Sequence, residues 1–156
     1  MSDDVPIAPD LDAAAIHGLL AHRYPFLLVD RIIIAERGRR VVGTKRISSG
    51  EWWCVGAEPG APTALAMPFA LVIEALAQTS GALVHDLLAG AAGSVAYFMG
   101  AQRVRIRGHA HPGDDLSLEL TLRQWRRGVC RTRGVASVDG RIILTAELTT
   151  VVRVGA

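Results

Sequence analysis

The 156-residue chain has little of what several classes of protein require. Its two cysteines, Cys54 and Cys130, are too few for a disulfide framework or a cysteine-based zinc site, which favours a reduced, cytoplasmic protein. Seventeen Lys and Arg residues against 15 Asp and Glu leave a net charge of +2, so overall charge gives no case for nucleic-acid binding. No metal-ligand cluster, phosphate-binding glycine loop or nucleotide fingerprint is present, and we expect no cofactor held by the chain itself.

Two marks of exported and membrane proteins are also missing. The segment 1–6 begins acidic and has no basic stretch followed by an apolar one, so we expect no secretory signal. The longest apolar stretch, 64–88, contains Glu74 and Asp86, and each charge would cost about 3 kcal/mol or more at mid-bilayer. A buried helix of a soluble protein is therefore the better prediction for this stretch.

Hydrophobic residues, by contrast, are plentiful. They form 50% of the chain, which excludes disorder as its main state, although only 5% of residues are aromatic. The length indicates that residues 1–156 form a single domain. Small aliphatic side chains must supply most of its core, and they are more numerous than one small monomer needs to bury.

The hydrophobic periodicity predicts one sheet and one dominant helix. A short helix is expected over 10–21 and a long one, buried nearly all round, over 69–89. The loop 48–68 is rich in proline and glycine, and such long loops are usually functional or disordered. The strand-like runs are 26–34, 41–47, 94–107, 115–126, 129–138 and 141–154. This order indicates an α+β fold in which an antiparallel sheet wraps around one long central helix.

Arginine is concentrated on one predicted strand. Arg103, Arg105 and Arg107 alternate with Val104 and Ile106, and a period of two places the three guanidinium groups on one face. That face is either an ordinary solvated surface or a docking site for an acidic partner or a phosphate, because the arginine fork matches phosphate oxygens.

Several separate motifs, in order along the chain, then resemble one known family. They are His22-Arg-Tyr-Pro-Phe-Leu-Leu-Val-Asp-Arg31, Val72-Ile-Glu-Ala-Leu-Ala-Gln78, Tyr97-Phe-Met-Gly100, His111-Pro-Gly-Asp114 and the hairpin at Asp139-Gly140. From about residue 16 to 153 the chain resembles the β-hydroxyacyl-acyl carrier protein dehydratases of fatty acid synthesis. The resemblance implies the hotdog fold and a dimer whose sheets join edge to edge, with two active sites at the subunit interface.

The resemblance also implies a catalytic pair, and here one member is missing. In the family, a loop histidine within Gly-His-Phe-Pro-Gly works with a Glu or Asp on the long helix of the partner subunit. This chain reads Gly56-Ala57-Glu58-Pro59-Gly60, so Ala57 stands at the histidine position, while Glu74 stands at the position of the carboxylate. The loop between them is about three residues longer than in the family.

Substrate and carrier contacts follow from the same resemblance. Where the family has Pro-Gly before the helix, with a glycine amide that polarises the thioester carbonyl, this chain has Pro68-Phe69. The substrate-binding residues implied are Gly56, Pro68, Phe69, Tyr97, Phe98, Met99 and Gly100. Docking of the acyl carrier protein is expected at Arg103, Arg105 and Arg107, with the substrate delivered on the carrier's phosphopantetheine arm. The partner subunit is either a second copy or a catalytic paralogue, and neither nucleic acid nor membrane is expected as a partner.

The chemistry makes the alanine consequential. Dehydration of a 3-hydroxyacyl thioester removes a proton next to the carbonyl and expels the C3 hydroxyl, for which an imidazole and a carboxyl are suited. The methyl side chain of alanine can neither accept the proton nor assist the departure of the hydroxyl. Glu58 is the best local substitute. We expect a structural role for His22, solvated side chains for His109 and His111, and an inert Cys54 thiol, while His85 lies about 16 Å from Glu74 along the helix.

Three readings of the missing histidine stay open. The chain is a dehydratase with an impairing substitution, a degenerate subunit that supplies Glu74 to a partner's histidine, or a non-catalytic protein that binds acyl carriers. Fatty acid and polyketide or polyene synthesis are the pathways in question. A hotdog-fold thioesterase, which needs a carboxylate and water but not always a histidine, is the alternative enzyme.

Overall fold

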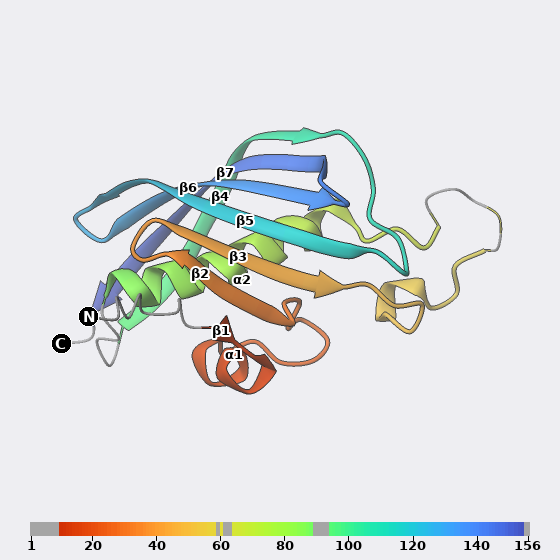
Figure 1. The fold of residues 1–156 in the computed structure, drawn as a ribbon, viewed down its shortest axis with the longest axis horizontal. Helices are drawn as coiled ribbons and strands as arrows, with labels where there is room; N and C mark the ends of the chain where they lie inside the picture. The colour runs from red at the N-terminus through yellow and green to blue at the C-terminus, as the bar shows by residue number, and fades with distance from the viewer. Residues whose placement is uncertain (1–9, 59, 61–63, 89–93, 155–156) are drawn as a thin grey trace, which may run out of the picture.

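Seven antiparallel strands form a single curved sheet around helix α2 in the computed structural model, which describes residues 10–58, 60, 64–88 and 94–154 (Figure 1). The strand order is β1-β2-β3-β5-β6-β7-β4. The elements are β1 (Asp10–Leu11), α1 (Ala13–Leu19), β2 (Arg31–Glu36), β3 (Arg40–Arg46), the short 3-10 helix η1 (Trp52–Cys54), α2 (Phe69–Leu87), β4 (Ser94–Ile106), β5 (Asp115–Arg126), β6 (Val129–Val138) and β7 (Arg141–Val154). The predicted α+β architecture, with its sheet around one long helix, is confirmed.

The two hairpins that join β5, β6 and β7 have the predicted bounds, because their turn residues suit them. Arg127 and Gly128 have φ angles of 49° and 75°, and Asp139 and Gly140 have 49° and 76°. Two successive residues in the left-handed region make the turn whose twist matches that of antiparallel strands. These three strands lie side by side between β3 and the edge strand β4 (Figure 1).

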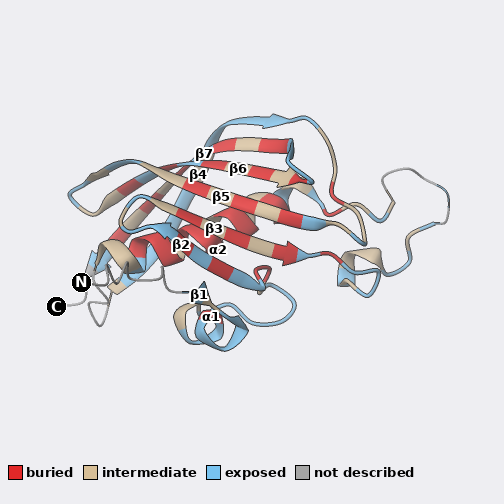
Figure 2. Ribbon diagram, in the orientation of Figure 1, coloured by how far each residue is buried: buried red, intermediate tan, exposed pale blue. Residues whose placement is uncertain are grey.

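Helix α2 supplies the centre of the core. Pro68 caps its N-terminus, and most of its residues are buried, as predicted (Figure 2). Even its polar residues Gln78, Thr79 and Ser80 are at most 2% exposed. The helix packs very closely on the sheet at Gly43 of β3, where a Cβ atom would overlap Thr79 Oγ1 and come within 2.9 Å of Thr79 Cγ2. Among the described helices, none has both the length and the apolar character that a membrane span requires.

Two predicted elements are shorter than expected. The helix predicted over 10–21 covers only α1, because Asp12 caps it by accepting a hydrogen bond from the Ala15 amide, and Asp10–Leu11 pair with β2 instead. The strand predicted over 26–34 begins only at Arg31. In the preceding segment, the side chain of Gln78 on α2, rather than a neighbouring strand, bonds the backbone of Phe26 and Leu28.

Strand β4 corrects the prediction for the arginines. Its pairing with β7 shifts between Gln102 and Arg105, and Arg103 has a φ of 50°. This β-bulge inserts one extra residue, so strict alternation of arginine and aliphatic faces does not hold there. Val104 and Ile106 are not buried on an inner face but 38% and 48% exposed.

Candidate active site around Glu74

Glu74 lies on α2 where the helix faces the segment 22–28, which connects α1 to β2. Its side chain is 29% exposed, and its Oε1 atom accepts a hydrogen bond of 2.9 Å from Gln78 Nε2, one helical turn further on. No partner of the second carboxylate oxygen, Oε2, is recorded among the described residues. One oxygen is thus anchored by Gln78, in a carboxylate that is partly exposed.

Gln78 fixes this geometry from within the core. Besides Glu74, its Nε2 donates to the carbonyl of Phe26 at 2.6 Å, and its Oε1 accepts from the amide of Leu28 at 2.9 Å. The side chain therefore clamps the segment 22–28 onto α2 while it orients the carboxylate. Losing the hydrogen bonds of a buried amide side chain costs free energy, so these bonds hold the segment 22–28 firmly on α2.

His22 is the unexpected neighbour of Glu74. Its Nε2 lies 3.2 Å from Glu74 Oε1, and its side chain is 42% exposed. The motif that contains His22 indicated only a structural role, and its side chain in fact faces the candidate catalytic carboxylate.

The loop that carries Ala57 makes no recorded bond to Glu74 in its described part. Ala57 is half-buried and follows η1, where its amide donates to the Cys54 carbonyl at 3.2 Å. Gly56 is exposed with a φ of 75°, and Glu58 is exposed as well, so neither is held at the site within one chain. Residues 59 and 61–63 of this loop lie outside the described residues.

At the N-terminus of α2, Phe69 has a partner that was not predicted. Pro68 is exposed, and the Phe69 ring lies 4.9 Å, centroid to centroid, from the ring of His109. His109 in turn lies 6.0 Å from His111. The prediction of solvated side chains for these two histidines is wrong, because both are half-buried and the rings cluster at the start of the helix.

The other predicted substrate-binding residues lie on β4, which forms one edge of the described sheet. Tyr97, Phe98 and Met99 are 50%, 41% and 64% exposed, and Gly100 follows a shift in the pairing with β7. Within the described residues, no hydrogen bond joins them to Glu74. They form an apolar edge rather than a closed pocket with the carboxylate.

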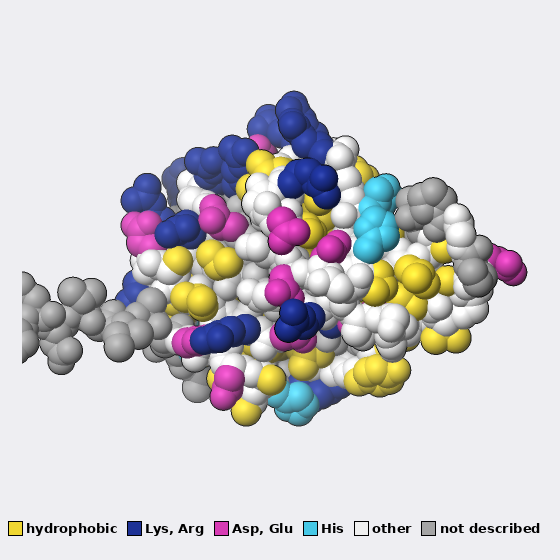
Figure 3. All heavy atoms as spheres, turned by 45° about the vertical axis from the view of Figure 1, so that its right-hand side comes forward, with side chains coloured by type: hydrophobic (Ala, Val, Ile, Leu, Met, Phe, Trp, Pro, Cys, Tyr) yellow, Lys and Arg dark blue, Asp and Glu magenta, His cyan; other side chains and the backbone are white. Residues whose placement is uncertain are grey.

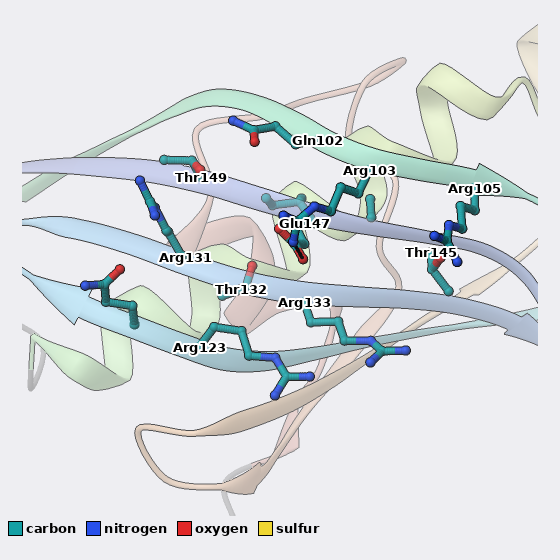
Figure 4. Close-up of a pocket in the computed structure, with 13 residues that line it drawn as sticks. Gln102, Arg103, Arg105, Arg123, Arg131, Thr132, Arg133, Thr145, Glu147 and Thr149 are labelled. Atoms are coloured by element: carbon teal, nitrogen blue, oxygen red, sulfur yellow. Dashed lines mark hydrogen bonds and ion pairs between the residues drawn. The ribbon is translucent and has the colours of Figure 1, made fainter.

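Several arginine side chains lie near one another on the face of the sheet away from α2, as Figure 4 shows. Arg131 and Arg133 alternate along β6 with buried Cys130 and Thr132, so their side chains lie on the face away from α2. Together with other side chains they line a hollow of about 720 Å³. We call this the arginine hollow; its basic residues are Arg103, Arg105, Arg123, Arg131 and Arg133.

The arginine hollow contains two of the three arginines predicted for docking, Arg103 and Arg105. Arg103 pairs with Glu147 at 2.9 Å, and no ion pair is recorded in the described chain for the other four arginines. Arg107 directly follows β4 and does not line the hollow. Figure 3 shows the basic side chains gathered over the upper part of the molecule. Arg123, Arg131 and Arg133 were not part of the predicted docking set, because they come from other strands.

Neither cysteine has the environment of a nucleophile. Burial raises the pKa of the Cys130 thiol to about 11, and desolvation followed by the charge of Glu51 raises the pKa of Cys54. Both thiols therefore stay protonated near neutral pH. The described residues contain no cluster of three or more side chains suited to hold a metal ion.

Comparison with solved structures gives the fold. The chain matches a chain of the dehydratase heterocomplex ApeI:P from Xenorhabdus doucetiae with a TM-score of 0.70 at 20% identity, over 87% of this chain and 89% of that one. It matches a hot-dog-like protein from Thermanaerovibrio acidaminovorans with a TM-score of 0.60 at 16% identity, covering 83% and 84% of the two chains. A hypothetical thioesterase with coenzyme A from Streptococcus pneumoniae gives 0.59 at 16% identity, covering 78% and 85%. The protein has the hotdog fold, as the resemblance implied.

Sequence comparison then gives the family. The model of the FabA-like domain matches residues 20–147. The 3-hydroxyacyl-[acyl-carrier-protein] dehydratase FabZ of Roseiflexus castenholzii is 42% identical over 138 residues, which cover 88% of this chain and 94% of the relative. FabZ of Pelotomaculum thermopropionicum is 43% identical over 143 residues, which cover 92% and 99%. The chain belongs to the FabA-like dehydratase family.

Proposed function

We propose that the protein is a FabZ-like dehydratase subunit that acts on 3-hydroxyacyl thioesters of an acyl carrier protein, in fatty acid or polyketide synthesis. Its own turnover is impaired, or depends on a partner, because Ala57 stands at the position of the family histidine. The observation that carries this proposal is Glu74, held by Gln78 and partly exposed on α2. The names of the FabZ relatives supply the substrate class.

The anchored carboxyl suits one half of the elimination. In its protonated form, Glu74 gives a proton to the hydroxyl that leaves C3 as water. The other half needs a base for the proton next to the carbonyl. Loss of a general base typically costs about 10²- to 10⁴-fold in rate, so an Ala57 site retains at most a small part of the family's activity.

A second chain would complete the site. Strand β4 offers an open edge of 13 residues that carries exposed Tyr97, Phe98 and Met99, and pairing of two such edges would bury these side chains. If the second chain is a paralogue with the loop histidine, it would meet Glu74 of this subunit across the interface. The ApeI:P structure is itself described as a dehydratase heterocomplex, which supports this arrangement.

The carrier would dock on the arginine hollow. The guanidinium groups of the hollow would form charge-assisted hydrogen bonds with carboxylates or a phosphate of the carrier. Arg103 and Arg105 belong to the edge strand β4, so the hollow would lie beside the strand that forms the subunit interface. No cofactor is required beyond that arm.

Hydration of a crotonyl thioester, the reverse reaction, tests the proposal. We expect Ala57→His to raise the rate of the purified chain by about 10²- to 10⁴-fold. Activity that appears only on mixing with a histidine-bearing paralogue would identify a heterodimer. Hydrolysis of the thioester without hydration would replace the proposal by a thioesterase, and binding of acyl carrier without either reaction would leave a non-catalytic subunit.

A further inference from the structure

An imidazole lies against Glu74 even though the loop position holds alanine. The distance from His22 Nε2 to Glu74 Oε1 is 3.2 Å, and both side chains are partly exposed, so a thioester that reaches the carboxyl also reaches the ring. We propose that His22 and Glu74 form an acid–base pair within one chain and carry the residual turnover of the site. This inference rests on the proposed dehydratase function.

The backbone on both sides of His22 is held in place. On its N-terminal side, Leu20 caps α1 through a bond from its amide to the Ile16 carbonyl, and Arg23 Nη1 donates to the carbonyls of Leu20 and His22 at 2.7 and 2.6 Å. On its C-terminal side, Gln78 bonds the backbone of Phe26 and Leu28. The imidazole is therefore presented to Glu74 by a segment that is fastened to α1 and to α2.

The histidines His17, His85 and His109 are placed elsewhere. His17 is exposed on α1, and His85 is exposed about 16 Å along α2 from Glu74, since eleven residues separate them at 1.5 Å each. His109 packs on the Phe69 ring at the start of the helix. The contact with Glu74 thus singles out His22 among these four side chains.

The contact allows a closed proton cycle. Neutral His22 takes the proton from C2 at Nε2, and the electron pair of that C–H bond becomes the C2=C3 double bond. The C3–O bond breaks, and the departing hydroxyl takes the proton of protonated Glu74 and leaves as water. An imidazolium and a carboxylate then face each other, and transfer of a proton from Nε2 to the carboxylate restores both groups without a third residue.

The experiment measures hydration of a crotonyl thioester by the full chain and three variants. We expect His22→Ala to lower the residual rate by at least about tenfold, toward the 10²-fold typical of a lost base. His22→Gln should lose as much, because an amide can donate a hydrogen bond in place of Nε2 but cannot accept the C2 proton. His17→Ala, the matched control on α1, should leave the rate unchanged. Retained activity in His22→Gln would overturn proton transfer by the imidazole.

A second background separates this inference from the proposed function. In Ala57→His, the loop imidazole supplies the base, so adding His22→Ala should cost much less than it costs in the natural chain. If the natural chain is inactive while Ala57→His is active, the His22 inference fails and the dehydratase function stands. If Ala57→His is inactive too, both alone and after mixing with a histidine-bearing paralogue, and circular dichroism shows a folded protein, both fail.

Discussion

Gly43 of β3 and Thr79 of α2 are in such close contact that the space for a Cβ atom on the strand is already filled by the threonine side chain. The helix can approach the sheet this closely only because one partner has no side chain. Since Gln78 precedes Thr79 and Glu74 lies on the same helix, this contact helps to set the depth at which the candidate site sits. The pair thus links core packing to the position of the candidate catalytic carboxyl.

Gly43→Ala should therefore destabilise the fold. The new methyl group overlaps Thr79, and overpacking of this kind typically costs about 1–3 kcal/mol. Adding Thr79→Ala removes the overlapping Oγ1 and Cγ2 atoms, so the double variant should be more stable than the sum of the two single changes predicts. Urea unfolding of the four proteins measures this coupling, and strictly additive free energies would contradict the packing argument.

Gln78→Leu should lower the free energy of unfolding by more than the change in side-chain volume suggests. The change leaves the buried Leu28 amide and the partly buried Phe26 carbonyl without their partner, and an unpaired buried group costs about 1–3 kcal/mol. We expect a loss of about 2–4 kcal/mol in the free energy of unfolding. Gln124→Leu, at an exposed position of β5, is the matched control and should stay within about 0.5 kcal/mol of the natural chain.

Charge reversal in the arginine hollow should weaken carrier binding. Arg131→Glu with Arg133→Glu replaces two neighbouring cations, and we expect at least about a tenfold loss of affinity for acyl carrier protein at low salt, which shrinks as salt screens the charges. Arg107→Glu, outside the hollow, is the control with a smaller effect. Fluorescence anisotropy with labelled carrier gives the affinities. Equal affinities for all the proteins at low salt would indicate that these arginines form an ordinary solvated surface.

The two thiols should differ in reactivity. Cys130 is 1% exposed with a pKa raised to about 11, while Cys54 is only partly buried. At neutral pH, iodoacetamide should therefore modify Cys54 slowly and Cys130 only after unfolding, as mass spectrometry of the labelled peptides can show. Labelling of Cys130 in the folded protein would contradict its burial.

The same burial predicts a pH dependence of stability. The thiol of Cys130 keeps its proton in the folded chain up to about pH 11, whereas an exposed thiol ionises near 9.0. Its contribution is thus fully present below pH 9 and is lost as the pH rises toward 11, because the unfolded chain releases the proton first. Cys130→Ala should lose less stability than the natural chain across this interval, in thermal unfolding at matched pH.

Where local chemistry decides the structure, the sequence predicted it well. Arg127-Gly128 and Asp139-Gly140 form the two hairpin turns themselves, so the bounds of β5, β6 and β7 agree with the prediction. The prediction of a buried helix also holds, because an apolar stretch of that length has few alternatives in a small domain.

Distant partners explain what was missed. The segment before Arg31 has strand-like composition, but the side chain of Gln78, fifty residues away, takes the backbone bonds that a strand would make. His22 and Glu74 lie 52 positions apart, and no periodicity brings them together. The spacing of four between Glu74 and Gln78 was the one local signal available, since such residues are neighbours on a helix.

The two outer strands of the described sheet differ in what they offer to a neighbouring chain. In β1, the described residues Asp10 and Leu11 pair with β2, and Asp10 is held by Arg31, whereas β4 offers 13 residues of backbone. A long strand at the edge of a sheet is a template to which another chain adds readily, so β4 is the edge at which we expect a second chain to join.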